Sequence, residues 1–264
     1  MENTGSGSMT VLKVDNLRKE FGGIVALDAL SFTLEKGTIT GLIGPNGAGK
    51  TTAFNVLTGF CRPDEGSAHF NGTGITDLPP FKIARLGIGR TFQNIRIFPQ
   101  ITVLENLMLA PRGQKGENIL PALFRPQQVE TDEKRAGEEA SRHLETVGLV
   151  DKKDELAENL SHGQRKLLVL ARALATGSQL LLLDEPTAGV FPETRNKILD
   201  LLQALRKAGK TILFIEHDMN VVTRISDTVI VLNYGRKIAE GPPEKIKSNK
   251  EVVEAYLGRS NATT

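Results

Sequence analysis

The sequence contains no tryptophan, a single cysteine and few aromatic residues, and each shortage excludes a class of protein. Because Cys61 is the only cysteine, the chain cannot form an internal disulfide, which is compatible with a reducing compartment. Aromatic residues make up 5% of the chain, too few for a platform that stacks single-stranded nucleic acid. The net charge of +2 is also too small to indicate a nucleic-acid partner, so we expect none.

Long hydrophobic runs are missing as well. No segment approaches the roughly 18 apolar residues that indicate a membrane-spanning helix. The opening residues, MENTGSGSM, lack the apolar core of a signal peptide, and their Gly and Ser content predicts a disordered leader over residues 1–9. These features predict a cytoplasmic location. The 264 residues are enough for one large domain, or for one domain with an inserted lobe.

The segment GPNGAGKTT carries the strongest functional signal. It follows the apolar run Thr38–Ile43, which predicts a buried strand, and precedes a helical pattern from Ala53. This is the strand–loop–helix context that a G-x-x-x-x-G-K-[ST] phosphate-binding loop requires, although a plain glycine-rich turn is the alternative. Loop amides and the helix N-terminus would hold the phosphates of ATP, while Lys50 reaches the β- and γ-phosphates and Thr51 holds Mg²⁺. The residues expected to contact the nucleotide are Gly44, Asn46, Gly47, Ala48, Gly49, Lys50, Thr51 and Thr52.

Two carboxylates end a second apolar run. The segment LLLLDE at Leu180–Glu185 places four leucines before an acidic pair, which predicts a fully buried parallel strand. Open α/β sheets bind ligands at the carboxyl ends of such strands. We therefore expect Asp184 to lie near Mg²⁺, and Glu185 to orient the attacking water and accept its proton. Alone, the pair could equally cap the turn that Pro186 begins; beside a phosphate loop, the catalytic interpretation is favoured.

Further motifs give the chain a family resemblance. Residues 160–164 read LSHGQ, which is similar to the family signature LSGGQ. The segment RTFQN contains Gln93, FIEHD contains His217, and Phe21 precedes the phosphate loop. With these motifs in order over residues 12–258, the chain resembles the ATP-binding subunits of ATP-binding-cassette (ABC) transporters.

The resemblance implies a role for each matching residue. Gln93 would bind Mg²⁺ and the γ-phosphate, His217 would contact the γ-phosphate, and Phe21 would stack on adenine. From the residues alone, Phe21 could instead belong to the core, Gln93 could be an exposed amide, and His217 could cap its strand. The signature residues that would contact ATP bound by a second subunit are Ser161, Gly163 and Gln164. The catalytic set implied for ATP hydrolysis is Lys50, Gln93, Glu185 and His217.

A finer resemblance indicates the subfamily. The segment GIGRTFQNIRIFPQITVLENLMLA, the pair Ala188-Gly189 and the tail EGPPEKIKSNKEVVEAYLG are similar to importer ATPases for branched-chain amino acids. ATPases for urea or amide transport and for lipopolysaccharide export share much of this pattern and stay as alternatives. Outside transport, a P-loop phosphotransferase shares the phosphate loop, but it does not need the LSHGQ segment.

The resemblance also implies partners. A second ATPase subunit, identical or different, would complete each ATP site, and a transmembrane permease would be driven by the pair. An extracytoplasmic substrate-binding protein would deliver the substrate. The chain would then lie on the inner face of the cytoplasmic membrane, attached through the permease.

Two positions depart from the family pattern. His162 replaces the first glycine of the signature; because the position starts a predicted helix, a side chain is tolerable there, although glycine's freedom is lost. Phe191 stands where the family usually has Asp or Asn, which puts a polar contact between subunits in doubt. A hydrophobic replacement in a packed turn is an equally good interpretation of Phe191.

The motifs and the apolar periodicity predict an α/β fold: a P-loop NTPase core with a parallel sheet, an antiparallel β subdomain and an inserted α-helical subdomain. The predicted core comprises residues 10–92 and 166–264, and the helical insertion comprises residues 93–165, ending in the signature loop. Antiparallel strands are predicted over residues 10–36, and a closing hairpin with its turn at residues 233–235. Helices are predicted at Thr102–Leu109 and Val129–Val147, with Pro111–Pro126 as a loop or short helices.

The segment NIRIFP after Gln93 contains an apolar cluster of ambiguous meaning. Ile95, Ile97 and Phe98 alternate with polar residues too briefly for a core strand, and Pro99 breaks the run. Phe98 could belong to the core of the helical lobe. Alternatively, as the resemblance implies, it could line a partly exposed groove that receives a helix of the membrane subunit.

Overall fold

The structure is a computed structural model that describes residues 9–92, 95–110 and 126–257. It divides into two compact units. The first unit comprises residues 1–90, 179–186 and 202–264, and the second comprises residues 91–178 and 187–201. The predicted leader lies almost entirely outside the described residues, as do Gln93 and most of the predicted 111–126 loop.

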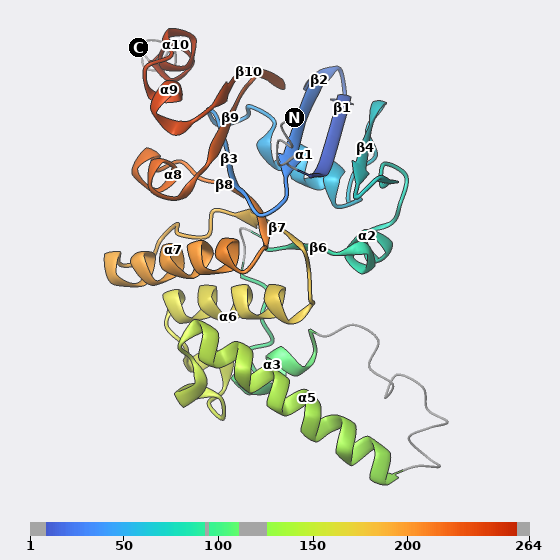
Figure 1. Ribbon diagram of the computed structural model, residues 1–264, viewed down its shortest axis with the longest axis vertical. Helices are drawn as coiled ribbons and strands as arrows, with labels where there is room; N and C mark the ends of the chain where they lie inside the picture. The colour runs from blue at the N-terminus through green and yellow to red at the C-terminus, as the bar shows by residue number, and fades with distance from the viewer. Residues whose placement is uncertain (1–8, 93–94, 111–125, 258–264) are drawn as a thin grey trace, which may run out of the picture. The chain divides into compact units, whose positions relative to one another are not determined.

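A six-stranded sheet forms the centre of the first unit (Figure 1), in the order β10-β9-β3-β8-β7-β6. Neighbouring strands from β9 to β6 run parallel, and β10 pairs antiparallel with β9. All residues of β3, β7 and β8 are buried, as the continuous apolar runs in the sequence predict. The strands are β3 Ile39–Ile43, β6 Ile88–Arg90, β7 Leu180–Asp184, β8 Thr211–Ile215, β9 Thr228–Asn233 and β10 Arg236–Gly241.

A second, antiparallel sheet has the order β2-β1-β4-β5. Its first two strands form the predicted hairpin, whose turn is Gly22-Gly23 with both glycines at positive φ. Burial alternates along much of β2, because one face of the sheet packs on the core. The strands are β1 Thr10–Phe21, β2 Ile24–Glu35, β4 Glu65–Phe70 and β5 Thr73–Gly74.

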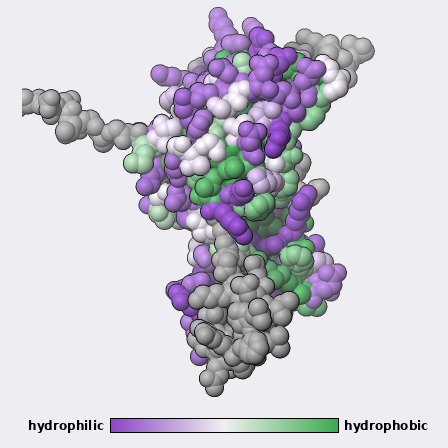
Figure 2. Space-filling model, turned by 90° about the vertical axis from the view of Figure 1, so that its right-hand side faces the viewer, coloured by the Kyte–Doolittle hydropathy of each residue, from purple (hydrophilic) through white to green (hydrophobic). Residues whose placement is uncertain are grey.

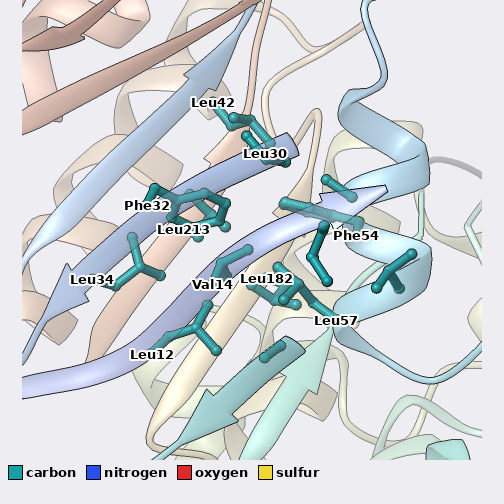
Figure 3. Packing of buried hydrophobic residues seen from close by; sticks show 14 of the residues in the cluster. Leu12, Val14, Leu30, Phe32, Leu34, Leu42, Phe54, Leu57, Leu182 and Leu213 are labelled. Carbon is teal, nitrogen blue, oxygen red and sulfur yellow. The ribbon is translucent and has the colours of Figure 1, made fainter. Parts of the chain in front are cut away.

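The core of the first unit lies where the two sheets meet α1 Lys50–Leu57 (Figure 3). Leu42, Leu182 and Leu213 come from the parallel sheet, Phe32 comes from β2, and Phe54 comes from α1, all of them buried. Fully burying a side chain of this size contributes roughly 1.5–3 kcal/mol. The loop that joins β3 to α1 is therefore anchored in this core at both of its ends.

The remaining helices of the first unit are short. They are α2 Pro80–Leu86, α8 Met219–Ile225, α9 Pro243–Lys247 and α10 Lys250–Leu257. The side chain of Asp218 caps α8 by accepting a hydrogen bond from the N–H of Asn220 at 2.9 Å. Both α9 and α10 pack against β10, so these two helices cover this edge of the sheet.

Helices dominate the second unit. Helices α3, α5 and α6 pack on one another. Helix α7 begins in this unit, and its residues from 202 onward belong to the first. The helices are α3 Val103–Met108, α5 Pro126–Val147, α6 His162–Ala175 and α7 Pro192–Lys207, with the short 3₁₀ turns η2 Val150–Lys152 and η3 Ala157–Asn159. The predicted helices at 102–109 and 129–147 are thus present, each starting within three residues of the expected position.

Hydrophilic residues cover most of the described surface in Figure 2, with green apolar patches among them. Several large apolar side chains are exposed, and those that matter below are Phe21, Phe98 and Phe191. Among the described residues, no helix combines the length and the apolar character that crossing a membrane requires.

Candidate functional site

The phosphate loop, residues 44–49, joins the buried strand β3 to the first turn of α1. Lys50 is the first residue of α1, and its Nζ donates to the carbonyl oxygens of Gly44 at 2.7 Å and Pro45 at 2.9 Å. The ammonium group is therefore held inside the loop, on a largely buried side chain. Asn46, Gly47 and Thr51 are exposed at the same place, and their backbone and hydroxyl groups can reach a ligand.

Two glycines of the loop are required by close packing. Gly44 has φ +148°, and a Cβ there would lie 2.1 Å from the carbonyl oxygen of Leu232. Gly49 has φ +101°, and a Cβ there would lie 2.4 Å from the carbonyl oxygen of Ala26. Both distances are far shorter than a real contact of a Cβ atom, so only glycine permits this backbone. The sequence motif is thus explained by steric contacts with β9 and β2.

The β9–β10 turn supports the phosphate loop from the other side. The N–H of Gly235 donates to the carbonyl oxygen of Ala48 at 3.0 Å, and the carbonyl oxygen of Gly235 accepts from the N–H of Asp28 at 3.0 Å. Arg236 continues the link, since its Nε donates to the Asp28 carboxylate at 2.7 Å. The loop is thereby fixed between β2 and a hairpin nearly 190 residues later in the chain.

Asp184 ends β7 as a buried carboxylate among several charges. It is 8% exposed, and burial raises its pKa above the usual range of an aspartate. Arg90 opposes this rise most strongly, with its Nη2 at 3.9 Å from Oδ2, and Lys50 and His217 act in the same direction, whereas Glu185 adds to the rise. The predicted cation, carboxylates and histidine therefore gather around one point at the end of the sheet.

Glu185 and His217 face each other at this same edge. Glu185 follows β7 with φ +47°, and its N–H donates to the carbonyl oxygen of Ile215 in β8 at 3.0 Å. Its Oε1 lies 2.7 Å from Nε2 of His217, which follows β8. A left-handed backbone is costly for a glutamate, and the neighbouring strand holds it there. The strained turn directs the carboxylate toward the imidazole.

Phe21 is the last residue of β1, at the start of the hairpin turn. Its ring is 51% exposed, so the core interpretation of Phe21 is wrong. The ammonium group of Lys19 lies over the ring, 5.3 Å from its centroid. An exposed aromatic face on a supported hairpin can stack on a planar ligand.

In the second unit, the signature segment forms the N-terminus of α6. Ser161 is the N-cap: its Oγ accepts from the N–H of Gln164 at 3.3 Å, and its own N–H donates to Oε1 of Gln164 at 2.8 Å. This capping box satisfies two backbone donors at the helix start. Gly163 lies against α7, because a Cβ there would be 2.9 Å from Cγ2 of Thr194. The signature pattern thus combines helix capping with close packing, and leaves the Ser161 hydroxyl exposed.

The two departures from the family pattern lie in this unit as well. His162 is the first residue of α6, as predicted, and its Nε2 would be 3.3 Å from a Cβ on Gly189. Phe191 is 84% exposed, so the interpretation as a packed turn is wrong. Both side chains lie on or beside the short segment between β7 and α7.

The Phe98 segment is held by a buried amide. The Nδ2 of Asn106 donates to the carbonyl oxygen of Phe98 at 2.9 Å, and its Oδ1 accepts from the N–H of Phe98 at 2.9 Å. The ring itself is 51% exposed and lies beside the Arg172 guanidinium, whose Nη1 also donates to the carbonyl oxygen of Arg96. Placement of Phe98 in the lobe core is therefore wrong, and its backbone is fixed while its ring faces solvent.

Two residues that the motifs did not single out support the site. The buried guanidinium of Arg90 donates through Nη1 to Asn55 at 2.8 Å and to Thr58 at 2.9 Å, which ties α1 to the Asp184 region. In the sequence, Arg90 could have been noticed as the charged residue that opens the RTFQN segment, three positions before Gln93. Burial raises the pKa of the Tyr256 hydroxyl on α10, and the nearby backbone of Gly44 opposes this rise. The only signal for Tyr256 was an aromatic residue in the tail.

Two family models match this sequence. Residues 27–188 match the model described as "ABC transporter", and residues 236–261 match "Branched-chain amino acid ATP-binding cassette transporter". A curated relative is the high-affinity branched-chain amino acid transport ATP-binding protein BraF of Pseudomonas aeruginosa. It is 41% identical over 254 residues, which cover 96% of this chain and 100% of the relative.

Solved structures are similar over nearly the same length. The ADP conformation of MJ1267, an ATP-binding cassette of an ABC transporter, has a TM-score of 0.83 and 38% identity, covering 95% of this chain and 100% of that one. A dimeric, post-hydrolysis structure of the cassette MJ0796, bound to ADP and Pi, has a TM-score of 0.73 and 27% identity. It covers 88% of this chain and 98% of that chain.

Proposed function

This chain belongs to the ABC transporter family, and we propose that it hydrolyses ATP to power amino-acid uptake, most specifically of branched-chain amino acids, through a separate permease. The observation that carries the proposal is the gathering of Lys50, Asp184, Glu185 and His217 at one end of the parallel sheet. Phosphoryl transfer depends mainly on positioning and on neutralising charge, and this group supplies both.

In this proposal each side chain has a separate task. Lys50, already held inside the phosphate loop, neutralises the β- and γ-phosphates. Glu185 orients the attacking water and accepts its proton, and His217 holds the Glu185 carboxylate in place and reaches the γ-phosphate. The loop glycines bring backbone N–H groups against the remaining phosphate oxygens.

The donor set also fits Mg²⁺, a hard cation that prefers oxygen ligands. Asp184 offers a carboxylate whose charge is disfavoured by burial, and Thr51, an exposed residue in the first turn of α1, offers a hydroxyl. We propose these two as ligands, together with Gln93, which lies outside the described residues. When bound, the ion would neutralise negative charge on the β- and γ-phosphates.

We also propose that ATP lies between two subunits. The phosphate loop of one chain would hold the nucleotide, and the exposed N-terminus of α6 in the second chain, with Ser161, Gly163 and Gln164, would contact its γ-phosphate. The dimeric relative bound to ADP and Pi supports a paired arrangement. The second chain can be identical or a related ATPase.

Mixing two inactive variants tests the shared site. Lys50→Ala removes the phosphate-loop cation, and Ser161→Arg blocks the signature loop. In a mixed dimer, one site would combine the intact phosphate loop of the second variant with the intact signature of the first. Hydrolysis by the mixture should then exceed that of either variant alone. If mixed dimers form and remain inactive, each chain would build its whole site alone.

Transport itself is tested by reconstitution. We propose that the chain lies on the inner face of the cytoplasmic membrane, attached to permease subunits that receive substrate from an extracytoplasmic binding protein. In liposomes with these partners, leucine, isoleucine or valine should stimulate ATP hydrolysis. Stimulation by urea, amides or lipopolysaccharide instead would reassign the substrate. The similarity to BraF, a branched-chain amino acid transport protein, supports branched-chain amino acids.

A further inference from the structure

A carboxylate outside every motif holds the chain immediately before Phe21. Asp64, in the loop before β4, makes three hydrogen bonds with consecutive residues of β1. Its N–H donates to the carbonyl oxygen of Arg18 at 2.8 Å, and its Oδ1 accepts from Nζ of Lys19 at 2.7 Å. Its Oδ2 accepts from the N–H of Glu20 at 2.7 Å. Both carboxylate oxygens are thus used to fix the strand end that carries the exposed ring.

The same carboxylate determines where the Lys19 ammonium lies. This ammonium group is over the Phe21 ring, 5.3 Å from its centroid. The Lys19 side chain is only 15% exposed, whereas Phe21 is 51% exposed. The Lys19 hydrogen bond lowers the pKa of Asp64, and the bond in turn raises the pKa of Lys19, so both groups are charged at neutral pH. One face of the ring carries a fixed cation, and the rest of the ring remains open.

We propose that Asp64 is a positioning residue for the base of the nucleotide: it fixes Lys19 and the Glu20 backbone so that the Phe21 ring presents one open face to adenine. The proposal rests on the proposed function, in which Phe21 stacks on the adenine ring. A ring fixed before binding loses less rotamer freedom when the base arrives, and this preorganisation increases affinity. Asp64 itself touches neither the base nor the phosphates.

The absence of tryptophan gives a direct test of ring mobility. Phe21→Trp introduces a single tryptophan, whose fluorescence can be excited selectively, at the site. With Asp64 present, we expect high anisotropy, and an emission change with ATP but not with tripolyphosphate, which has no base. Adding Asp64→Ala should lower the anisotropy and weaken ATP binding by about three- to tenfold.

Steady-state kinetics provide the second test, in a chain that keeps Phe21. Asp64→Ala should raise the KM for ATP by about three- to tenfold with kcat within about twofold, because the phosphate-handling groups are intact. Asp64→Asn, which keeps an acceptor for the Glu20 amide, should show a smaller rise. Asp15→Ala is the matched control: it breaks the exposed Lys13–Asp15 pair, 2.8 Å long, on the same strand, and should change neither parameter.

The phosphate-only probe and the Phe21→Ala background separate the possible failures. In the Phe21→Ala chain, Asp64→Ala should add less than about a twofold loss of ATP affinity, because the two residues act as one unit. If ATP and tripolyphosphate affinities fall equally, or if Asp64→Ala leaves ATP affinity unchanged while Phe21→Ala lowers it, the positioning role is overturned alone. If Phe21→Ala does not lower ATP affinity, the stacking role of Phe21 falls, and the role of Asp64 falls with it.

Discussion

Nε2 of His217 lies 2.7 Å from Oε1 of Glu185, so the two proposed catalytic side chains contact each other directly. They come from the ends of neighbouring parallel strands, β8 and β7, whose register pairs Asp184 with Ile215. The Glu185 backbone is held at φ +47° by a hydrogen bond to Ile215. The sheet therefore sets the position of the Glu185 carboxylate, and the contact with the His217 imidazole helps to hold it there.

We expect Glu185→Gln to bind ATP normally and to lower turnover by about 10²- to 10⁴-fold, since the amide keeps the shape but cannot accept a proton. His217→Ala should lower turnover by a similar factor, and the double variant should be little worse than either single variant, because the pair acts as a unit. Single-turnover hydrolysis and ATP binding measure the two effects. Glu193→Gln, at an exposed carboxylate, is the control. Additive losses in the double variant would contradict the joint action.

Asp184 should make the stability of the metal-free protein depend on pH. Burial raises its folded-state pKa, so its contribution to stability is complete below the unfolded value of about 3.9 and is lost as the pH rises through the folded value. Asp184→Asn removes this loss. In EDTA, the variant should therefore exceed the native chain in Tm at pH 7, by about 2–4 °C for each 1 kcal/mol relieved, and the difference should shrink toward pH 4.

The same variant tests the proposed metal site. In the presence of ATP, adding Mg²⁺ should raise the Tm of the native chain but should scarcely raise that of Asp184→Asn, because one oxygen ligand has lost its charge. Thermal unfolding by circular dichroism is sufficient for both comparisons. If the Tm difference in EDTA between Asp184→Asn and the native chain does not depend on pH, burial of the Asp184 charge is not the cause of that difference.

Gly44→Ala should be severely destabilising. A Cβ at this position would overlap the Leu232 carbonyl at 2.1 Å, in addition to the cost of positive φ. We expect a loss of about 4 kcal/mol or more in urea unfolding. Gly72→Ala is the matched control, since Gly72 has φ +78° with open space around it, and it should cost only about 1–2 kcal/mol. Similar losses in both variants would show that the positive φ alone, and not steric overlap with Leu232, accounts for the loss of stability.

Phe98 is the expected contact with the permease. Because its ring is exposed while Asn106 fixes its backbone, Phe98→Ala should leave folding and basal ATP hydrolysis nearly unchanged. Binding to the permease should weaken by about 1–3 kcal/mol, as for an apolar anchor. Val253→Ala, at an exposed apolar residue of α10, should not affect binding. A stability loss of Phe98→Ala near the 3–5 kcal/mol of a buried phenylalanine would contradict this placement.

Motifs and apolar runs predicted those parts of the molecule whose structure depends on short segments of sequence. The prediction of an ABC-type ATPase with a P-loop α/β core is confirmed, and so are the buried strands ending at Ile43 and Asp184. These runs are continuous, and the loop residues follow at fixed spacing, so a short window of sequence is enough. The closing hairpin around Tyr234 was predicted on the same basis, from a turn between alternating strands.

Contacts between distant segments could not be predicted in this way. Arg90 bridges α1 and Asp184, and Asp64 holds Lys19 across 45 positions, but neither pair has a spacing rule. The exposure of Phe98 and Phe191 could not be predicted either, because an apolar residue in a short loop gives the same sequence pattern whether it packs or faces solvent. Tertiary packing alone decides between these outcomes.

The position of β3 has a consequence for synthesis on the ribosome. This strand, which leads into the phosphate loop, pairs with β8 and β9, whose residues begin at Thr211 and Thr228. The loop itself rests on Leu232 and Gly235. A nascent chain therefore displays its complete GPNGAGKTT segment long before the strands that shape it have been translated. Capture of the emerging protein on immobilised ATP should succeed only for nearly full-length chains, so that nucleotide affinity appears at the end of translation.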